Sequence, residues 1–254
     1  MKQIPNIFTL LNLFFGCLAI VMILQNGLVI QYNADGAQVV SIPEKIWMAS
    51  LFIGIAAIVD FFDGFIARMF SASSEMGKQL DSLADVVSFG VAPAMILYQF
   101  LRLGFAGQED GLNISLVWLF PAFILPMAAA YRLARFNLDN SQQYGFKGVP
   151  VPAVGLLVAS FPLIYWFNDT ALVNRVLLNP WIMYALIAIL SWLMISTLPL
   201  IALKFKNFSF NQNKAKYILL IISLISIVLL QWLAAPVIFA LYIVLSLLFK
   251  NKES

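Results

Sequence analysis

Asp60-Phe61-Phe62-Asp63-Gly64-Phe65-Ile66-Ala67-Arg68 is followed, after eight residues, by Gly77-Lys78-Gln79-Leu80-Asp81-Ser82-Leu83-Ala84-Asp85. Both segments lie in long apolar runs, where an aspartate at the centre of a membrane-spanning helix costs about 2.5–3.5 kcal/mol. Acids in such places are rare unless they serve a function. Four of them near one another indicate a functional site and require a shared counter-charge.

Helical spacing puts each pair of acids on one face beside small residues. The first face carries Asp60, Asp63, Gly64 and Ala67, and the second carries Gly77, Asp81 and Asp85. If the two helices pack as antiparallel neighbours joined by residues 69–76, all four carboxylates converge. The two glycines then let a bulky phosphate ester approach the helices, and Arg68, about one turn from Asp63, is placed to contact a phosphate.

Such a cluster favours one or two hard divalent cations, Mg²⁺ or Mn²⁺, which prefer oxygen ligands and share them with substrate phosphates. The expected metal ligands are Asp60, Asp63, Asp81 and Asp85. Acids in membrane helices also serve as proton relays or ion-pathway residues, so an ion or proton transporter is the alternative from another class. A transporter predicts acids spread through the membrane depth and an inverted repeat. Here the acids gather near one face, and no such repeat is evident.

The constrained positions of the two segments resemble the signature of the CDP-alcohol phosphatidyltransferase family, without a departure in type or spacing. These positions are Asp60, Asp63, Gly64, Ala67, Arg68, Gly77, Asp81 and Asp85. Further stretches resemble the bacterial and archaeal branch of the family that uses serine. They are Ile4-Pro5-Asn6-x-x-Thr9-x-x-Asn12-x-x-x-Gly16, residues 79–94, Arg132-Leu133-Ala134-Arg135-Phe136-Asn137 and Gly148-Val149-Pro150-Val151-Pro152-Ala153.

The resemblance implies transfer of a phosphatidyl group from CDP-diacylglycerol to the hydroxyl of L-serine, giving phosphatidylserine and CMP. It implies that the four aspartates hold the metals, that Asp81 and Asp85 are catalytic, and that Asp85 takes the hydroxyl proton. The residues expected to contact the CDP-lipid are Asn6, Thr9, Asn12, Asp60, Gly64, Ala67, Arg68 and Gly77. The signature covers only the CDP-alcohol half of the reaction, so glycerol 3-phosphate, inositol phosphate or another alcohol is the alternative acceptor.

Two assignments have ordinary structural alternatives. Asn6, Thr9 and Asn12 share one helix face, so they either line the nucleotide site or form interhelical hydrogen bonds. Arg132 and Arg135, one turn apart, are the best-placed cations for the serine carboxylate. Their alternative role is to anchor a helix at the membrane rim. If neither arginine binds serine, Lys147 or Lys78 is the next candidate.

Composition predicts one integral membrane domain spanning residues 1–254. Hydrophobic residues make up 62% of the chain and charged residues 11%, whereas about 25% of an average soluble domain is charged. The sequence contains no His, so the proton acceptor must be a carboxylate, an amine, a tyrosine or a substrate group. The single Cys17 excludes an internal disulfide. Beyond the two substrates, we expect membrane lipids as partners, a homodimer, and no nucleic acid.

Apolar runs and their breaks predict an all-α polytopic bundle of about eight transmembrane helices. The predicted spans are Ile7–Leu24, Ile46–Phe70, Leu83–Leu103, Leu116–Phe136, Val149–Phe167, Trp181–Leu203, Ala215–Gln231 and Ala234–Phe249. The catalytic helices then lie within about residues 46–103, and the helices within about 215–249 are peripheral. The last two spans require a turn at Gln231-Trp232, before Pro236.

The distribution of Lys and Arg predicts the orientation, because cytoplasmic loops carry an excess of both. With the N-terminus in the cytoplasm, the cytoplasmic side carries Lys2, Arg68, Lys78, Arg132, Arg135, Lys147, Lys204, Lys206, Lys214, Lys216, Lys250 and Lys252. Only Lys45, Arg102 and Arg175 fall on the other side. This places both termini and the acidic site at the cytoplasmic face of the inner membrane of a prokaryote.

Overall fold

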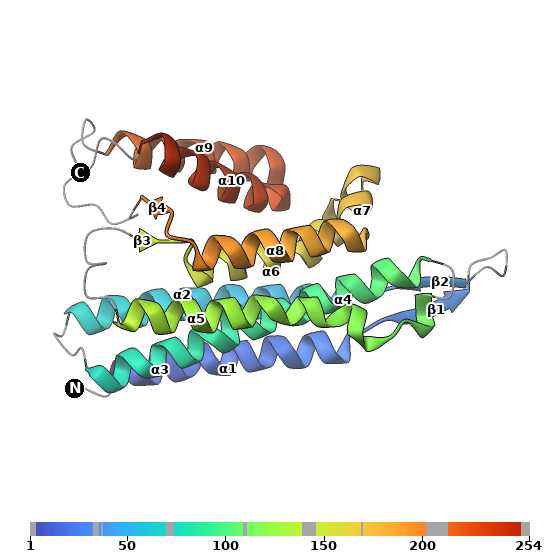
Figure 1. Ribbon diagram of the computed structural model, residues 1–254, viewed down its shortest axis with the longest axis horizontal. Helices are drawn as coiled ribbons and strands as arrows, with labels where there is room; N and C mark the ends of the chain where they lie inside the picture. The colour runs from blue at the N-terminus through green and yellow to red at the C-terminus, as the bar shows by residue number, and fades with distance from the viewer. Residues whose placement is uncertain are drawn as a thin grey trace.

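The protein is a bundle of apolar helices with two short β pairs at its ends (Figure 1). The computed structural model describes residues 4–32, 36, 38–69, 74–108, 111–138, 146–168, 170–201 and 213–249. The α-helices are α1 (Ile4–Gln25), α2 (Trp47–Met69), α3 (Glu75–Asp85), α4 (Ala92–Ala106), α5 (Ile124–Leu138), α6 (Val151–Phe167), α7 (Ala171–Leu177), α8 (Pro180–Ile195), α9 (Lys214–Leu230) and α10 (Ala234–Leu248).

Shorter elements join or extend these helices. The π-helical η2 (Val86–Val91) makes α3 and α4 continuous, and the 3₁₀ segments are η1 (Glu44–Ile46), η3 (Gly111–Asn113), η4 (Leu116–Phe123) and η6 (Gln231–Leu233). The strands are β1 (Val29–Tyr32), β2 (Gln38–Ser41), β3 (Phe146–Lys147) and β4 (Pro199–Leu200). Strand β1 pairs antiparallel with β2, and β3 pairs antiparallel with β4.

The predicted class, a helical membrane protein, is confirmed. Five helical stretches in the described part of the chain are long and apolar enough to cross a membrane, or up to six if the bent pair α7 and α8 counts as one. The five stretches are Pro5–Gln25, Glu44–Ile66, Glu75–Ala106, Leu116–Leu138 and Lys214–Leu248. Helix α6 is apolar but shorter, with 17 residues. Many large apolar side chains on these helices are exposed, as expected where lipid replaces water.

One predicted boundary was wrong, and one predicted span is part of a longer helix. The span predicted at Leu83–Leu103 covers only the apolar part of a helix that begins at Glu75, because the polar first turns carry no hydropathy signal. This start agrees with the connection expected over residues 69–76. Ser74 caps this start, and its hydroxyl accepts a hydrogen bond from the Gly77 backbone N–H at 3.0 Å. The span predicted to end at Leu203 stops being helical at Ile195, since Pro199 disfavours helix in the residues before it.

The turn predicted at Gln231-Trp232 is confirmed. Gln231 has a φ of 50°, which ends α9, and α9 and α10 lie side by side at the edge of the bundle (Figure 1). Helix α7, both β pairs and the π-helical segment were not predicted. The strands have two to four residues each, too few to produce a recognisable alternation.

Helix α1 is the shared neighbour of the two acid-bearing helices. It packs along α2 and also against α3 and η2, so α2 and α3 are held together mainly through α1. The centre of the bundle lies between α4 and α6, where the Phe100 ring meets the rings of Phe161 and Tyr165 edge to face, with centroids 6.4 and 5.7 Å apart.

The segment η2 fits closely against two neighbouring helices because each presents a glycine to it. A Cβ on Gly16 of α1 would lie 2.8 Å from the Cα of Ser88, and one on Gly155 of α6 would lie 2.9 Å from the Cα of Phe89. Real Cβ atoms do not approach backbone this closely. The two glycines therefore fix how near α1 and α6 come to the helix that carries Asp85.

We predict that Gly16→Ala lowers the free energy of unfolding by about 1–3 kcal/mol, because the added methyl group overpacks the α1–η2 contact. The matched control is Gly54→Ala in α2, where a Cβ would meet nothing within 4 Å. That change should be neutral or stabilising by up to about 1 kcal/mol. Thermal unfolding of both purified variants in the same detergent measures the difference. Equal melting temperatures would contradict the close contact.

Candidate functional site

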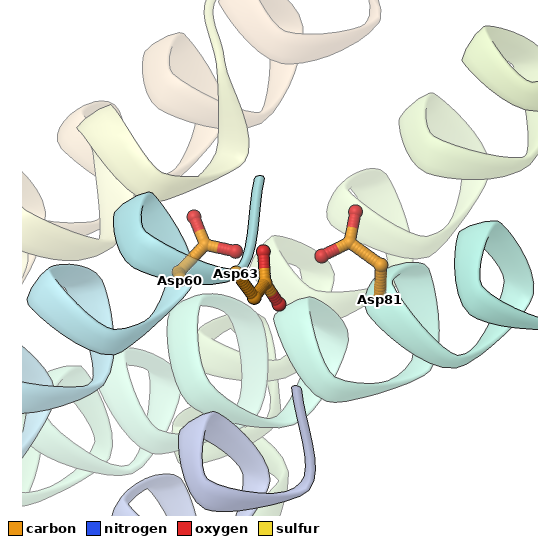
Figure 2. Close-up of side chains that lie close together, drawn as sticks. All are labelled: Asp60, Asp63 and Asp81. Carbon is orange, nitrogen blue, oxygen red and sulfur yellow. The ribbon is translucent and has the colours of Figure 1, made fainter. Parts of the chain in front are cut away.

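Three of the four predicted acids converge at one end of the bundle. Asp60 and Asp63 lie one turn apart in the last third of α2 or just before it, and Asp81 lies in the second half of α3. One carboxylate oxygen from each lies within 4.8 Å of the other two. Figure 2 shows the three carboxyl groups pointing toward a common space between the helices. Asp63 is buried, whereas Asp60 and Asp81 are half-buried, so the group is open on one side.

Helix α1 holds one member of this group by a direct hydrogen bond. The Thr9 hydroxyl donates to Oδ2 of Asp63 at 2.8 Å and also lies 3.2 Å from the Pro5 carbonyl oxygen. Thr9 is only 3% exposed. A buried carboxylate with a fixed donor has one preferred rotamer, so Thr9 orients Asp63 toward the other two acids.

Asp85 is held by α1 in a second hydrogen bond and lies outside the group of three. Its Oδ1 accepts from the Asn12 side-chain amide at 3.2 Å, and Asn12 is fixed in turn by Ser88, whose hydroxyl donates to the Asn12 carbonyl at 3.0 Å. The expectation that all four carboxylates meet at one level was therefore only partly right. Asp85 lies one helical turn beyond Asp81, about 6 Å further along the axis. Its role as a metal ligand stays a prediction.

The group of three suits a hard divalent cation. Carboxylate oxygens on two facing helices are the ligand type that Mg²⁺ and Mn²⁺ prefer. Three negative charges so close together repel one another, and a bound cation removes that repulsion. The open side leaves space for further ligands from a substrate phosphate. Asp60, Asp63 and Asp81 are thus the residues that fit a metal ion.

The remaining residues predicted to contact the CDP-lipid lie around this group as far as they are described. Asn6 faces the start of α3, because a Cβ on Gly77 would lie 3.1 Å from Asn6 Oδ1. Gly64 is half-buried and directly follows Asp63. Ala67 and Arg68 belong to the last turns of α2, but their side chains lie outside the described residues.

Thr9 and Asn12 form the interhelical hydrogen bonds that were the alternative to lipid contact, so a lipid-binding role for them stays a prediction.

The two arginines predicted to bind serine differ in their partners. Arg135 donates from Nη1 to the Ile195 carbonyl at 2.7 Å and from Nη2 to the Ser196 carbonyl at 3.0 Å, at the end of α8. Arg132 is 5% exposed, and its Nη2 reaches the Gly148 carbonyl only at 3.5 Å. Its Nε is buried without a hydrogen-bond partner among the described residues. Arg132 therefore has the greater capacity to bind a ligand.

A link between α3 and α5 was not predicted, although one of its members, Lys78, was a further candidate for binding the serine carboxylate. The Asn137 amide donates to the Ser82 hydroxyl at 2.8 Å, and Lys78 Nζ donates to the Asn137 carbonyl at 2.9 Å. Ser82 directly follows Asp81, so the link fixes the helix that carries the third acid. The spacing of Lys78 and Ser82, four residues apart on one face, was the available signal. The helix they would meet could not be known from spacing alone.

Comparison with known proteins supports the chemistry of this site. A family model described as CDP-alcohol phosphatidyltransferase matches residues 2–192. A CDP-diacylglycerol–serine O-phosphatidyltransferase from Helicobacter pylori is 29% identical over 246 residues, which cover 94% of this chain and 87% of the relative. Proteins of the same name from Bacillus subtilis and Methanocaldococcus jannaschii are 33% and 34% identical. Their alignments cover 65% and 49% of this chain, and 78% and 61% of the relatives.

We predict that Asp81→Asn weakens Mn²⁺ binding by at least about tenfold, because one of three charged ligands becomes neutral. The matched control is Glu75→Gln on the same helix, an exposed acid two turns earlier. It should leave Mn²⁺ affinity within about twofold. Electron paramagnetic resonance of free Mn²⁺ during titration of the purified protein measures both. Equal Mn²⁺ affinity in the Asp81 variant and the unmodified protein would exclude Asp81 as a ligand.

Proposed function

Because the chain belongs to the CDP-alcohol phosphatidyltransferase family, we propose that it transfers the phosphatidyl group of CDP-diacylglycerol to the hydroxyl of L-serine. Phosphatidylserine and CMP are the products. The observation that carries this proposal is the convergence of Asp60, Asp63 and Asp81 at one end of an apolar bundle. The serine acceptor is supported by the names of relatives that align with most of this chain.

A divalent cation, Mg²⁺ or Mn²⁺, is the proposed cofactor, as one or two ions. When bound, it neutralises the charge of the substrate pyrophosphate and stabilises the departing CMP. Asp60, Asp63 and Asp81 are the proposed ligands, with Asp85 as a further candidate. The half-buried faces of Asp60 and Asp81 leave room for the pyrophosphate beside them.

Asp85 is the proposed general base. The hydroxyl of serine attacks the phosphorus atom that bears diacylglycerol, and the bond from this phosphorus to the CMP oxygen breaks. Asp85 takes the hydroxyl proton, since the sequence contains no His to do so. One oxygen of Asp85 accepts from Asn12, which leaves the other available for the proton. Asn12 and Ser88 thereby position the base without touching the reacting atoms.

Arg132 is the proposed partner of the serine carboxylate. A carboxylate pairs best with a guanidinium that has donors available. The Nε of Arg132 is buried and has no hydrogen-bond partner among the residues that the structure describes. Arg135 already donates two hydrogen bonds to backbone carbonyls at the end of α8. We therefore assign the acceptor role to Arg132 and a structural role to Arg135. If Arg132 does not bind serine, Lys147 and Lys78 are the next candidates.

We propose that the site faces the cytoplasm in the inner membrane of a prokaryote. The end of the bundle that holds the three acids also carries Lys78, Arg132, Arg135, Lys214 and Lys216, at the starts or ends of α3, α5 and α9. The opposite end carries Lys45, Arg102 and Arg175, in η1, α4 and α7. An excess of Lys and Arg marks the cytoplasmic side. Helix α1 begins and α10 ends at the site end (left in Figure 1), so both termini would be cytoplasmic.

The acceptor decides between serine transfer and the alternatives within the family. We expect the purified protein to release CMP from CDP-diacylglycerol only when L-serine and Mg²⁺ or Mn²⁺ are both present, with phosphatidylserine as the lipid product. Parallel reactions contain glycerol 3-phosphate, inositol phosphate or no acceptor, and a chelator control removes the metal. Release with another alcohol but not with serine would overturn the acceptor assignment. No release under any condition, together with no CDP-lipid binding, would favour a transporter.

Asp85→Asn should lower turnover by at least about 100-fold while CDP-diacylglycerol binding stays within about threefold, because the amide cannot accept the serine proton. Single-turnover CMP release gives the chemical rate, and a binding titration with the same preparation gives the affinity. The binding measurement is also the folding control. Full turnover in this variant would eliminate Asp85 as the base.

A further inference from the structure

Two loop segments meet near the site and form a compact unit. We call residues 146–149 and 193–201 the Gly148 junction. Within it, β3 pairs with β4, with Phe146 opposite Leu200 and Lys147 opposite Pro199. The Gly148 N–H donates to the Leu198 carbonyl at 2.9 Å, and the Val149 N–H donates to the Leu193 carbonyl at 3.0 Å. The junction thereby joins the start of α6 to the end of α8.

Gly148 allows the two segments to pack at this distance. Its φ is +78°, a conformation that side-chain-bearing residues rarely adopt. A Cβ there would lie 2.5 Å from the Met194 carbonyl oxygen and 2.7 Å from that of Ser196. The position of the Gly148 carbonyl is therefore set by how the segment after α8 is held.

Both arginines of α5 bind this junction on the side of the site. Arg135 donates to the carbonyls of Ile195 and Ser196, and Arg132 reaches the Gly148 carbonyl. The contact of Arg132 is long, at 3.5 Å. Within the described part of the chain, the Gly148 carbonyl is nonetheless the hydrogen-bond partner of the Arg132 guanidinium, and Arg132 is only 5% exposed. Movement of the junction would therefore shift the guanidinium.

Helix α10 holds the junction on the other side. The Tyr242 hydroxyl donates to the Ile201 carbonyl at 3.2 Å, and the Ile201 N–H donates to the Ser246 hydroxyl at 3.2 Å. The Ser246 hydroxyl itself donates to the Tyr242 carbonyl at 2.7 Å. Tyr242 is 7% exposed and Ser246 is 1% exposed. Figure 1 shows β4 between α10 and the end of α8.

These contacts distinguish α10 from a helix that only crosses the lipid bilayer and makes no polar contacts with the rest of the protein. Its other residues are almost all apolar, yet the two that carry hydroxyls lie four residues apart on one face and bind both backbone groups of a single residue. Buried hydroxyls are retained in such a helix when they satisfy a polar group that would otherwise lack a partner. The helix lies beyond residue 192, where the family match ends, so this bracing belongs to the C-terminal extension.

We infer that Tyr242 and Ser246 are positioning residues for acceptor recognition. They hold Ile201 and the Gly148 junction, and the junction sets the place of the Arg132 guanidinium that binds the serine carboxylate. The inference rests on the proposed function, in which Arg132 has that role. Both act through their hydrogen bonds to Ile201 and not as substrate ligands. The group of three acids and Asp85 lie on α2 and α3. Helix α10 packs against α6, α9, η6 and β4 rather than against α2 and α3. Changes in α10 should therefore leave the CDP-lipid half of the site unaffected.

The test compares two kinetic constants in Tyr242→Phe and Ser246→Ala. Initial rates are measured against serine at saturating CDP-diacylglycerol, and against CDP-diacylglycerol at saturating serine. The KM for serine should rise roughly 2- to 10-fold in each variant, the effect of losing one hydrogen bond. The KM for CDP-diacylglycerol and kcat should stay within about twofold. Arg132→Lys serves as the reference for a damaged acceptor site.

Tyr184→Phe is the matched control. Tyr184 also donates its hydroxyl to a backbone carbonyl, that of Trp118, but at the opposite end of the bundle. This variant should leave the KM for serine unchanged even if its melting temperature falls. An unchanged serine KM in both α10 variants would overturn this inference but leave the proposed function standing. The inference would also be overturned if the serine KM rose equally in the Tyr184 variant, or if the KM for CDP-diacylglycerol rose equally in the α10 variants. If the unmodified protein does not transfer to serine, the proposed function fails first.

Discussion

The repulsion among three carboxylates is the constraint on which the structure of the site depends. Asp60, Asp63 and Asp81 lie within 4.8 Å of one another, where each charged pair repels by on the order of 3 kcal/mol at an effective dielectric constant of about 20. Helix packing must hold these groups together until a cation neutralises them. Helix α1 does this by contacting both acid-bearing helices and by donating from Thr9 to Asp63 and from Asn12 to Asp85.

Features that depend on local chemistry were predictable from the sequence. Helical spacing placed Asp60 beside Asp63 on one face, and the cost of acids in an apolar run identified both as functional. Hydropathy located the apolar helices, and the polar break at Gln231-Trp232 located the turn between the last two. The serine-using branch was recognisable because several motifs with defined spacing occur together in one chain.

Features that depend on the packing of distant segments were not predictable. Spacing on α3 could not show that the Asp85 carboxylate would accept a hydrogen bond from Asn12 on α1. The pairing of β3 with β4 rests on two residues in each strand, and no pattern that short identifies a partner. The difference between Arg132 and Arg135 arises because only Arg135 reaches the end of α8. Such contacts join residues more than 50 positions apart in the chain.

The most direct test of the central claim is the position of a bound Mn²⁺ ion. Crystals grown with Mn²⁺ and CDP-diacylglycerol give an anomalous difference map in which only the metal and heavier scatterers are prominent. We predict a peak within about 2.0–2.6 Å of carboxylate oxygens from Asp60, Asp63 and Asp81, with a pyrophosphate oxygen on its open side. Bound CDP-diacylglycerol with no metal peak between these three residues would contradict it.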